Sequence, residues 1–527
     1  MKTEIKGEKN MRVNNQNINL SQMINEESKL IQALKMEANQ KRTENGALAY
    51  NSTNSDVYNL FAFGGAYRTR SDEDVVNLFK KAYTEDAELA LKCLFYLRDC
   101  RGGQGERRFF RVAYKWLCNN HPEIAAKFLT EIPNFGRWDD LLYITYETPC
   151  FKQAMDIIYE QIFLDLRCQT PSLLAKWLPS ENASSEKTRS MAKVIRKELA
   201  RRDPSPFTAK TYRQMLSILR KRINIVESLM SSNQWDKIEF DKIPSKAGLI
   251  YKNAFARRDI ISKKYETFAK DENTKVNANT LYPYEIVDKA LKAESATDRA
   301  VINKYWKNLP DYFEGKPASM ICMVDTSGSM WGQPINVAIS LGLYCAERLR
   351  GPFANHYISF ASRPQLIPTN DEPDFCSQVR AIEDKNLCDN TNLEAAFELL
   401  LHTAQRYNLS QEMMPETIVV ISDMEIDQGA CSYSFRGSRW TSWTKANIST
   451  EMEKMRGRWA SAGYKLPRLI YWNVNARQNT ILDAGPMVSY VSGCSPVIFK
   501  SVLTGKNGYS LMLDTITNKR YDSITLD

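Results

Sequence analysis

The sequence predicts a multidomain protein in which an all-α helical-repeat domain precedes an α/β domain with a doubly wound, mainly parallel sheet. Two changes of pattern along the 527-residue chain support this prediction. From about residue 56 to 270, apolar residues recur at spacings of three and four, which is typical of amphipathic helices. From about residue 315, short apolar runs alternate with helical segments, as in a parallel sheet whose strands are buried on both faces.

Composition divides the chain into four segments. Residues 1–55 are rich in Asn, Lys, Glu and Ser and poor in large apolar residues, so we expect a flexible tail there. The helical domain is expected over 56–300 and the α/β domain over 315–500, with a C-terminal extension over 501–527. A hydrophobic fraction of 43% is sufficient for a core in both domains.

The helical domain is predicted to be a run of antiparallel helices joined by short turns that contain Gly, Pro or Asn. Ser71 is expected to cap one helix, because the three acidic residues after it would complement the helix dipole. Helix pairs stacked in this way usually form solenoids, although the sequence has no clear internal period. The predicted helices cover residues 72–83, 86–98, 108–118, 122–130, 153–165 and 208–230.

Two features of the helical half have both a structural and a functional interpretation. The stretch 101–107, RGGQGER, holds three glycines, but it follows a helix and lacks the Gly-Lys-Ser/Thr ending of a phosphate-binding loop. We therefore interpret it as a turn between helices. Trp138, Trp177 and Trp235 could stack on nucleic-acid bases, but a large aromatic residue at a helix boundary more often packs in the core.

The α/β domain is predicted from strands that alternate with helices. The apolar run 319–324 ends at Asp325, and the apolar run 417–422 ends at Asp423. In a doubly wound sheet, ligands bind outside the carboxyl ends of the strands, so both aspartates are expected at one edge. Further strands are predicted at 356–361, 468–474 and 487–491, and helices at 334–350, 392–407 and 448–461.

A metal-site signature follows the first of these strands. The sequence Asp325-Thr-Ser327-Gly-Ser329 resembles the Asp-x-Ser-x-Ser motif of the metal-ion-dependent adhesion site (MIDAS) of von Willebrand factor A (vWA) domains. Thr391 resembles the threonine in the second loop of that site, and Asp423 resembles the aspartate in its third loop. The resemblance implies that Asp325, Ser327, Ser329, Thr391 and Asp423 form a divalent-metal site.

The residues of this site suit a hard cation. Hydroxyl and carboxylate oxygens are ligands that Mg²⁺ prefers, and Mn²⁺ or Ca²⁺ accepts the same kinds of ligand. A position left open on the metal could take a carboxylate from a protein partner. Nothing in the sequence is evidently poised to activate Ser327 or Ser329 as a nucleophile, so we expect binding, with metal-dependent hydrolysis as a less supported alternative. The chain departs from the vWA pattern at Met424, where many vWA domains have glycine, and Glu425 and Asp427 add carboxylates nearby.

The positive charge of the chain is concentrated in one segment. The formal net charge is +9, and residues 187–222 hold twelve Lys and Arg residues against Glu198 and Asp203, so the rest of the chain is close to neutral. Such a segment attracts phosphates, although it is also compatible with a merely solvated helix face. On the helix 208–230, Lys210, Arg213, Arg220 and Lys221 are expected opposite the apolar face. The residues predicted to bind RNA are Lys193, Arg196, Lys197, Arg201, Arg202, Lys210, Arg213, Arg220 and Lys221.

The order of the two domains resembles that of the Ro ribonucleoprotein family. Its TROVE module is a HEAT-like α-helical ring that binds RNA and is joined to a vWA domain. The stretches LRDCRGGQGERRFF, IPNFGRWDDLL, LAKWLPS, YRQMLSILRKRINIVE and IPSKAGLIYKNAFARRD resemble in particular a Ro-like family of plants, viruses and bacteriophages. The resemblance covers about residues 55–500. It implies a partner that is single-stranded RNA or a small structured RNA.

Three functions remain open at this point: an RNA-binding ribonucleoprotein component, a metal-dependent protein-interaction or adaptor protein that binds no RNA, and a hydrolase. We expect no enzyme, because the three histidines are far apart in the sequence. The eleven cysteines include no CxxC pair, which argues against a disulfide framework and a zinc cluster. No apolar run is long enough to span a membrane, so we expect a cytoplasmic protein without a membrane partner.

Overall fold

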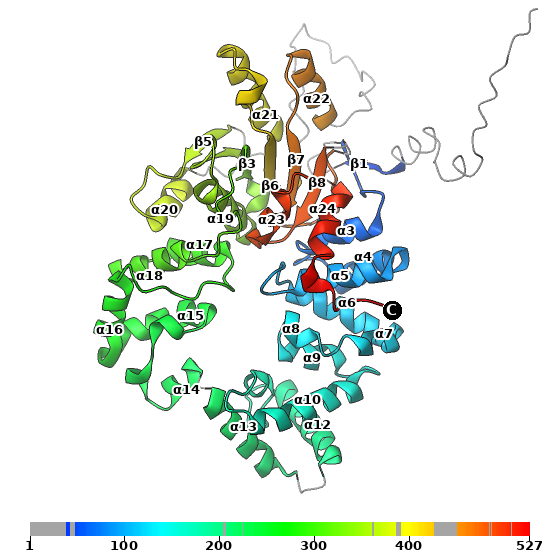
Figure 1. The fold of residues 1–527 in the computed structure, drawn as a ribbon, viewed down its shortest axis with the longest axis vertical. Coiled ribbons are helices and arrows are strands. Elements are labelled where there is room, and N and C mark those ends of the chain that lie inside the picture. Colours follow the sequence, from blue (N-terminus) through cyan, green and yellow to red (C-terminus); the bar gives the residue numbers. More distant parts are fainter. Residues whose placement is uncertain are drawn as a thin grey trace, which may run out of the picture.

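The computed structural model describes residues 38–42, 48–203, 207–223, 225–360, 363–385, 392–425, 451–483, 485, 487–506 and 508–526. Its first half is helical, and its second half holds a six-stranded sheet with helices. The predicted combination of an all-α part and an α/β part is therefore confirmed. Figure 1 shows that the helices from α3 (Asp56–Gly64) to α18 (Ala296–Lys307) follow an arc that leaves the sheet on one side and returns to it on the other.

The arc consists of short helices joined by tight turns. The cap predicted at Ser71 is present, because its hydroxyl accepts a hydrogen bond from Asp74 N (3.1 Å) at the start of α4. The single helix predicted over 208–230 is two helices, α13 and α14. The helices between α3 and α18 are α4 (Asp72–Glu85), α5 (Ala87–Arg98), α6 (Arg107–Asn120), α7 (Pro122–Lys127), α8 (Ile132–Phe135), α9 (Trp138–Thr145), α10 (Phe151–Arg167), α11 (Leu174–Trp177), α12 (Glu186–Arg202), α13 (Ala209–Ile223), α14 (Val226–Ser231), α15 (Ser245–Arg257), α16 (Asp259–Lys270) and α17 (Pro283–Leu291).

The sheet has the strand order β5-β4-β3-β6-β7-β8, and every neighbouring pair is parallel except β4 and β5. All residues of β3, β6 and β7 are buried, as expected for strands covered on both faces. The antiparallel strand β5 is not predicted from the sequence, because it is short and largely exposed. The strands are β3 (Met320–Asp325), β4 (His356–Phe360), β5 (Gln365–Pro368), β6 (Thr417–Ser422), β7 (Arg468–Asn473) and β8 (Val488–Ser492).

Helices surround this sheet. The helix predicted at 334–350 is present as α19, and those predicted at 392–407 and 448–461 are present as α21 and α22. The helices of the α/β part are α19 (Gln333–Arg348), α20 (Phe375–Lys385), α21 (Leu393–Arg406), α22 (Glu451–Ser461), α23 (Phe499–Val502) and α24 (Gly508–Ile516). None of the helices in the described part of the chain is long and apolar enough to cross a membrane.

Both ends of the helical arc pack against the α/β part. At one end α3 contacts β8, where Gly65 N donates a hydrogen bond to Ser492 Oγ (2.9 Å). Beside it, Ala476 N donates to Ala66 O (3.1 Å). At the other end α17 packs against α19 and α20. The edge of the sheet at which β7 and β8 end therefore faces the helices, and the arc and the sheet together close a ring (Figure 1).

Two segments outside the predicted domains are part of this packed structure. Strand β2 (Leu48–Tyr50) pairs with β1 (Gln40–Arg42), and the backbones of Tyr50 and Ile481 exchange two hydrogen bonds of 2.8 Å. The flexible tail expected over 1–55 is thus replaced by packed structure at Tyr50. At the other terminus, the ring of Tyr521 stacks on that of Phe135, with 5.5 Å between centroids. Composition does not reveal either segment, because the partners are hundreds of residues away.

Candidate functional site

Two carboxylates meet where the neighbouring parallel strands β3 and β6 end. Asp325 and Asp423 are both fully buried. Asp325 Oδ1 accepts a hydrogen bond from Ser327 N (2.9 Å), and its Oδ2 accepts one from Ser422 Oγ (2.6 Å). The sharp turn after β3 therefore positions both the carboxylate and the serine that follows it. As the sequence predicts, the two aspartates lie at one edge of the sheet.

Asp423 has an oxygen without a hydrogen bond. Its Oδ1 accepts from Glu425 N (3.2 Å), whereas its Oδ2 is buried and accepts no hydrogen bond. Burial, followed by the charge of Asp325, raises the pKa of Asp423 to about 7. Two buried carboxylates so close together need a counterion if both are to be charged. Arg477 Nη2 lies 3.7 Å from Asp423 Oδ2 and supplies one positive charge. A hard divalent cation would add to it, and the donor set fits such an ion.

Serine hydroxyls complete the candidate metal centre. Ser327 Oγ and Ser329 Oγ lie 3.1 Å apart. The structure thus brings together four of the five residues predicted to bind the metal, and the fifth, Thr391, lies outside the described residues, as does Asp427. Among the described residues, no group of three or more His, Cys, Asp and Glu side chains could hold a metal ion. The candidate centre therefore depends on its hydroxyls as well as on its two carboxylates.

The loop after β6 holds the residues at which the sequence departs from the vWA pattern. Met424 adopts a φ of +65°, a left-handed conformation that glycine adopts most readily. Met424 N donates to Ser422 Oγ (3.0 Å), which fixes this turn. Glu425 is buried, and its carboxylate accepts a hydrogen bond from Thr480 Oγ1 (3.2 Å). Met424 therefore adopts a backbone conformation that favours glycine, and Glu425 contacts the loop after β7 instead of solvent.

A cation from the loop after β7 stands beside the carboxylates. Arg477 Nη2 lies 3.7 Å from Asp423 Oδ2 and donates a hydrogen bond to Ser329 O. The backbone oxygen of Arg477 accepts a hydrogen bond from Arg70 in the loop between α3 and α4. This loop thus connects the candidate metal centre to the helical part. The sequence offers no signal for Arg477, because it belongs to no motif.

A cavity of about 620 Å³ lies between the two sides of the helical arc. Segments far apart in the sequence line it: the stretch 101–107 from the loop after α5 to the start of α6, the turn 133–138, α11, the start of α15 and the segment 280–284. Gln333 at the start of α19 and Cys494 add lining from the α/β part. Four of the five stretches that resemble the Ro-like family contribute to this lining. The RGGQGER stretch is confirmed as a turn between helices, and it also faces the cavity.

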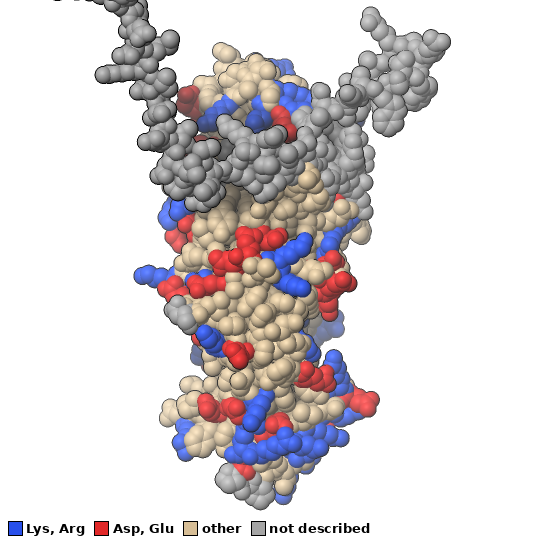
Figure 2. All heavy atoms as spheres, turned by 90° about the vertical axis from the view of Figure 1, so that its right-hand side faces the viewer, with Lys and Arg blue, Asp and Glu red and all other residues tan. Residues whose placement is uncertain are grey.

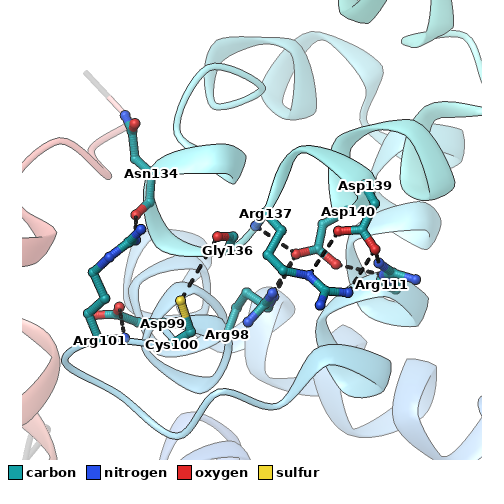
Figure 3. Close-up of polar contacts among 10 residues, drawn as sticks. All are labelled: Arg98, Asp99, Cys100, Arg101, Arg111, Asn134, Gly136, Arg137, Asp139 and Asp140. Atoms are coloured by element: carbon teal, nitrogen blue, oxygen red, sulfur yellow. Dashed lines mark hydrogen bonds and ion pairs between the residues drawn. The ribbon is translucent and has the colours of Figure 1, made fainter. Parts of the chain in front are cut away.

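Guanidinium groups outnumber carboxylates beside this cavity. Figure 3 shows Asp139 and Asp140 between three arginines. Asp140 Oδ2 binds Arg98 Nη2 (2.6 Å), and its Oδ1 binds Arg111 Nε (2.6 Å). Asp139 Oδ1 accepts from Arg137 Nε (2.9 Å). Two carboxylates thus compensate three guanidinium groups, which leaves a local excess of positive charge.

Arg107 adds a further cation at the start of α6. Its guanidinium group has no hydrogen bond or ion pair with the residues that the structure describes, and it lines the cavity. Partial burial, followed by the charges of Arg137 and Arg111, lowers the pKa of Arg107 from its usual value. An arginine remains protonated even so. Arg107 therefore offers its charge to a ligand in the cavity.

Aromatic rings line the same cavity. The guanidinium carbon of Arg137 lies 4.0 Å from the centroid of the Trp177 ring. The rings of Tyr282 and Tyr284 are stacked, with 6.1 Å between centroids and 13° between planes. Trp138 and Trp177 are partly exposed, whereas Trp235 is buried. The core interpretation thus fits Trp235 and in part Trp138, which packs against the core, and both Trp138 and Trp177 line the cavity.

The predicted basic surface lies on the outside of the ring. Figure 2 shows Lys and Arg side chains gathered near the lower end of the molecule, where α10 and α12 lie in Figure 1, whereas charges of both signs are mixed above. Six of the nine residues predicted to bind RNA are exposed: Lys193, Lys197, Arg201, Lys210, Arg213 and Lys221.

The other three predicted residues are held by the protein itself. Arg196 Nε pairs with Glu181 (2.7 Å), and Arg202 Nε pairs with Asp156 (2.6 Å). Arg220 does not lie on the solvent face with its neighbours on α13, because its guanidinium group turns toward the end of α11 and satisfies three acceptors there. These acceptors are Ala175 O (2.8 Å), Leu178 O (2.7 Å) and Ser180 Oγ (2.9 Å). Arg220 thus supports the segment that carries Trp177.

Two family models, one viral protein and one solved structure are similar to this chain. The family described as "Domain of unknown function (DUF2828)" matches residues 43–161 and 150–330, more than half of the chain, and "Domain of unknown function (DUF7788)" matches 319–521. The "Uncharacterized protein L728" of Acanthamoeba polyphaga mimivirus is 28% identical to this chain over an alignment of 533 residues. The alignment covers 91% of this chain and 87% of that protein. The crystal structure of the Ro (RSR) protein of Deinococcus radiodurans is similar over 88% of this chain and 99% of that chain, with 13% identity and a TM-score of 0.45.

Proposed function

This chain belongs to the family described as "Domain of unknown function (DUF2828)", and we propose that it is an RNA-binding protein that holds a single strand in the cavity of its ring. The observation that carries the proposal is the position of Arg107. Its guanidinium group, which has no partner among the described residues, lines the same cavity as Trp138, Trp177, Tyr282 and Tyr284. Single-stranded nucleic acids are bound by this combination of cations for phosphates and aromatic rings for bases.

The outer surface of α12 and α13 has a second role in this proposal. Its exposed cations attract a polyanion at long range and add phosphate contacts that are independent of sequence. The proposed activity is binding and not catalysis. None of the three histidines of the chain lines the cavity, and the side chains that do line it are suited to holding a strand in place.

The proposal is tested by the affinity for a fluorescent single-stranded oligoribonucleotide, measured by anisotropy. We expect Arg107→Glu to lower the affinity by at least about tenfold, since it removes one cation and places a carboxylate near the phosphates. The matched control is Arg108→Glu, which changes the same charge one residue away. Arg108 pairs with Asp72 and does not line the cavity, so this control should bind nearly as well as the wild type.

The salt dependence of the RNA affinity tests whether Arg107 contacts a phosphate. Arg107→Gln should reduce the slope of log affinity against log salt by about 0.7, the value for one phosphate contact of a single strand. Equal losses in the Arg107 and Arg108 variants, or no retention of RNA by the wild type at low salt, would overturn the proposal.

A divalent metal at the edge of the sheet is the second part of the proposed function. Asp325, Asp423, Ser327 and Ser329 would hold Mg²⁺, Mn²⁺ or Ca²⁺, with Thr391 as the fifth ligand that the vWA resemblance implies. The support is the buried Asp423 Oδ2, which accepts no hydrogen bond. A partner carboxylate could bind the open position of such a metal, and this is the role that the adaptor interpretation needs.

Calorimetry tests whether the protein binds a divalent metal at this site. Saturating metal should stabilise the wild type by about 2.7 kcal/mol at a hundredfold excess over the dissociation constant, and a chelator should reverse this. Asp423→Asn keeps the size of the side chain and removes its charge, so it should abolish the shift. An unchanged melting temperature of the wild type with all three metals would rule the site out.

A further inference from the structure

A second cavity opens beside the first. It has a volume of about 840 Å³ and lies between α15, α17 and the start of α19. Lys246, Tyr284 and Gln333 line both cavities, so the two spaces are contiguous. The second cavity therefore extends the interior of the ring toward the loop that follows β3.

An exposed tryptophan lines the second cavity. Trp331 follows the turn Gly328–Met330 and is 77% exposed. A side chain of this size usually buries most of its surface, which makes an exposed indole a candidate for contact with a ligand. Within the described part of the chain, no aromatic ring or cation packs on its face. Trp331 is thus free to stack on a flat ligand that enters from the cavity.

The charges around the second cavity are balanced. Lys246 pairs with Glu285 (2.9 Å), and Lys292 pairs with Asp288 (2.6 Å). This lining therefore lacks the excess of positive charge found in the first cavity. A strand that crosses both cavities would have its phosphates held in the first one and would contact the second one mainly through its bases.

We propose that the RNA strand held in the first cavity continues past Lys246, Tyr284 and Gln333 into the second cavity and stacks a base on Trp331. The inference rests on the proposed RNA binding and extends it to a site that the predicted basic residues do not include. Base stacking tolerates every sequence, because each base has a π face. The strand contacts Trp331 only when it is long enough to reach across both cavities.

The test compares short and long oligouridylates on the full-length protein. Trp331→Ala should lower the affinity for long oligonucleotides by about tenfold, the loss expected for one stacked base, and leave the affinity for short ones unchanged. Trp331→Phe keeps an aromatic face and should retain most of the affinity. Tyr407→Ala is the matched control, because Tyr407 is an aromatic residue that is 66% exposed and lines neither cavity.

The outcomes separate this inference from the function on which it rests. Long oligonucleotides that bind Trp331→Ala as tightly as the wild type, while Arg107→Glu loses affinity, would overturn the inference and leave the RNA-binding proposal standing. In that case the apolar surface at Trp331 would serve a protein partner. A loss with Tyr407→Ala as large as that with Trp331→Ala would also overturn it. No binding by the wild type at any length would remove both proposals.

Discussion

Asp140 holds two arginines in place beside the first cavity. It is fully buried and binds both Arg98, which is 3% exposed, and Arg111. Breaking a buried pair leaves an uncompensated charge, so Asp140→Ala should lower the free energy of unfolding by about 3–5 kcal/mol. Asp72→Ala, which breaks the exposed pair with Arg108, should cost less than about 1 kcal/mol. Denaturant titrations measure the free energy of unfolding of both variants. If Asp140→Ala loses as little stability as Asp72→Ala, the ion pairs of Asp140 do not stabilise the segments beside the cavity.

Arg220 is the residue whose role changes most between sequence and structure. Since it satisfies three acceptors at the end of α11, Arg220→Ala should destabilise the protein by about 1–3 kcal/mol. Arg213→Ala on the exposed face of the same helix should be nearly neutral. Thermal melts compare the two variants. If Arg220→Ala is as stable as Arg213→Ala, the three hydrogen bonds of Arg220 do not stabilise the protein, and Arg220 behaves like a residue of the solvent-exposed face.

The site residues differ in how far the sequence reveals them. Asp325 and Asp423 can be predicted because each directly follows an apolar run, and the topology of a parallel sheet then places them together. The role of Arg220 cannot be predicted from the sequence. A helical wheel shows on which side of the helix Arg220 lies, but it does not show which acceptors from other segments its guanidinium group meets. Arg107 belongs to a stretch with four cations in eleven residues, and only the packing of the arc shows which of them has no partner among the described residues.

At the scale of elements, the turn between α5 and α6 closes the ring against the segment before α17. Gly105 has a φ of +67°, and a Cβ atom there would lie 1.5 Å from Tyr282 Oη. Gly105→Ala should therefore strain the backbone and push the two segments apart, with a loss of stability of about 1–3 kcal/mol. Tyr282→Phe should recover part of this loss, because it removes the clashing hydroxyl.

A double-mutant cycle measures this contact. Purely additive effects of Gly105→Ala and Tyr282→Phe would show that the two segments do not meet as the structure describes. The matched control is Gly463→Ala. Gly463 also has a positive φ, of +84°, but a Cβ atom there would meet nothing within 4 Å. The backbone strain should thus be present in this control without any coupling to Tyr282.

Periodicity predicts the elements that bury one continuous surface. The strands β3, β6 and β7 are found within a residue or two of their predicted bounds, because each is an apolar run covered on both sides. The edge strand β5 and the helix α20 escape prediction, since their burial depends on neighbours and not on a local pattern. The same holds for the break between α13 and α14.

At the scale of the whole molecule, the loop after β7 joins the candidate metal centre to the helices. Arg477 contacts both Ser329 and Asp423, and Arg70 binds its backbone oxygen. Metal binding should therefore slow amide hydrogen exchange in the loop between α3 and α4 as well as in the turn after β3. Asp423→Asn should show neither effect. If metal slows amide exchange only in the α/β part, metal binding does not affect the helical part, and the contacts of Arg477 do not couple the two parts.

The closure of the ring could not be predicted from the sequence. It depends on the packing of α3 on β8 and of α17 on α19 and α20. Pairs such as Tyr50 with Ile481 and Tyr521 with Phe135 then connect the terminal segments to distant parts of the chain. Neither terminal segment has a periodicity that indicates its partner. The order of an all-α and an α/β part follows from local patterns, whereas their mutual arrangement follows only from the packing.

The central claim is that RNA lies in the first cavity and not only on the outer basic surface. Photochemical crosslinking of a bound single strand, followed by mass spectrometry of the attached peptides, tests it most directly. We predict nucleotide adducts on the peptides that carry Trp138, Trp177 and Tyr282, with their loss in Arg107→Glu. Adducts found only on peptides of α12 and α13, and unchanged by Arg107→Glu, would contradict the claim.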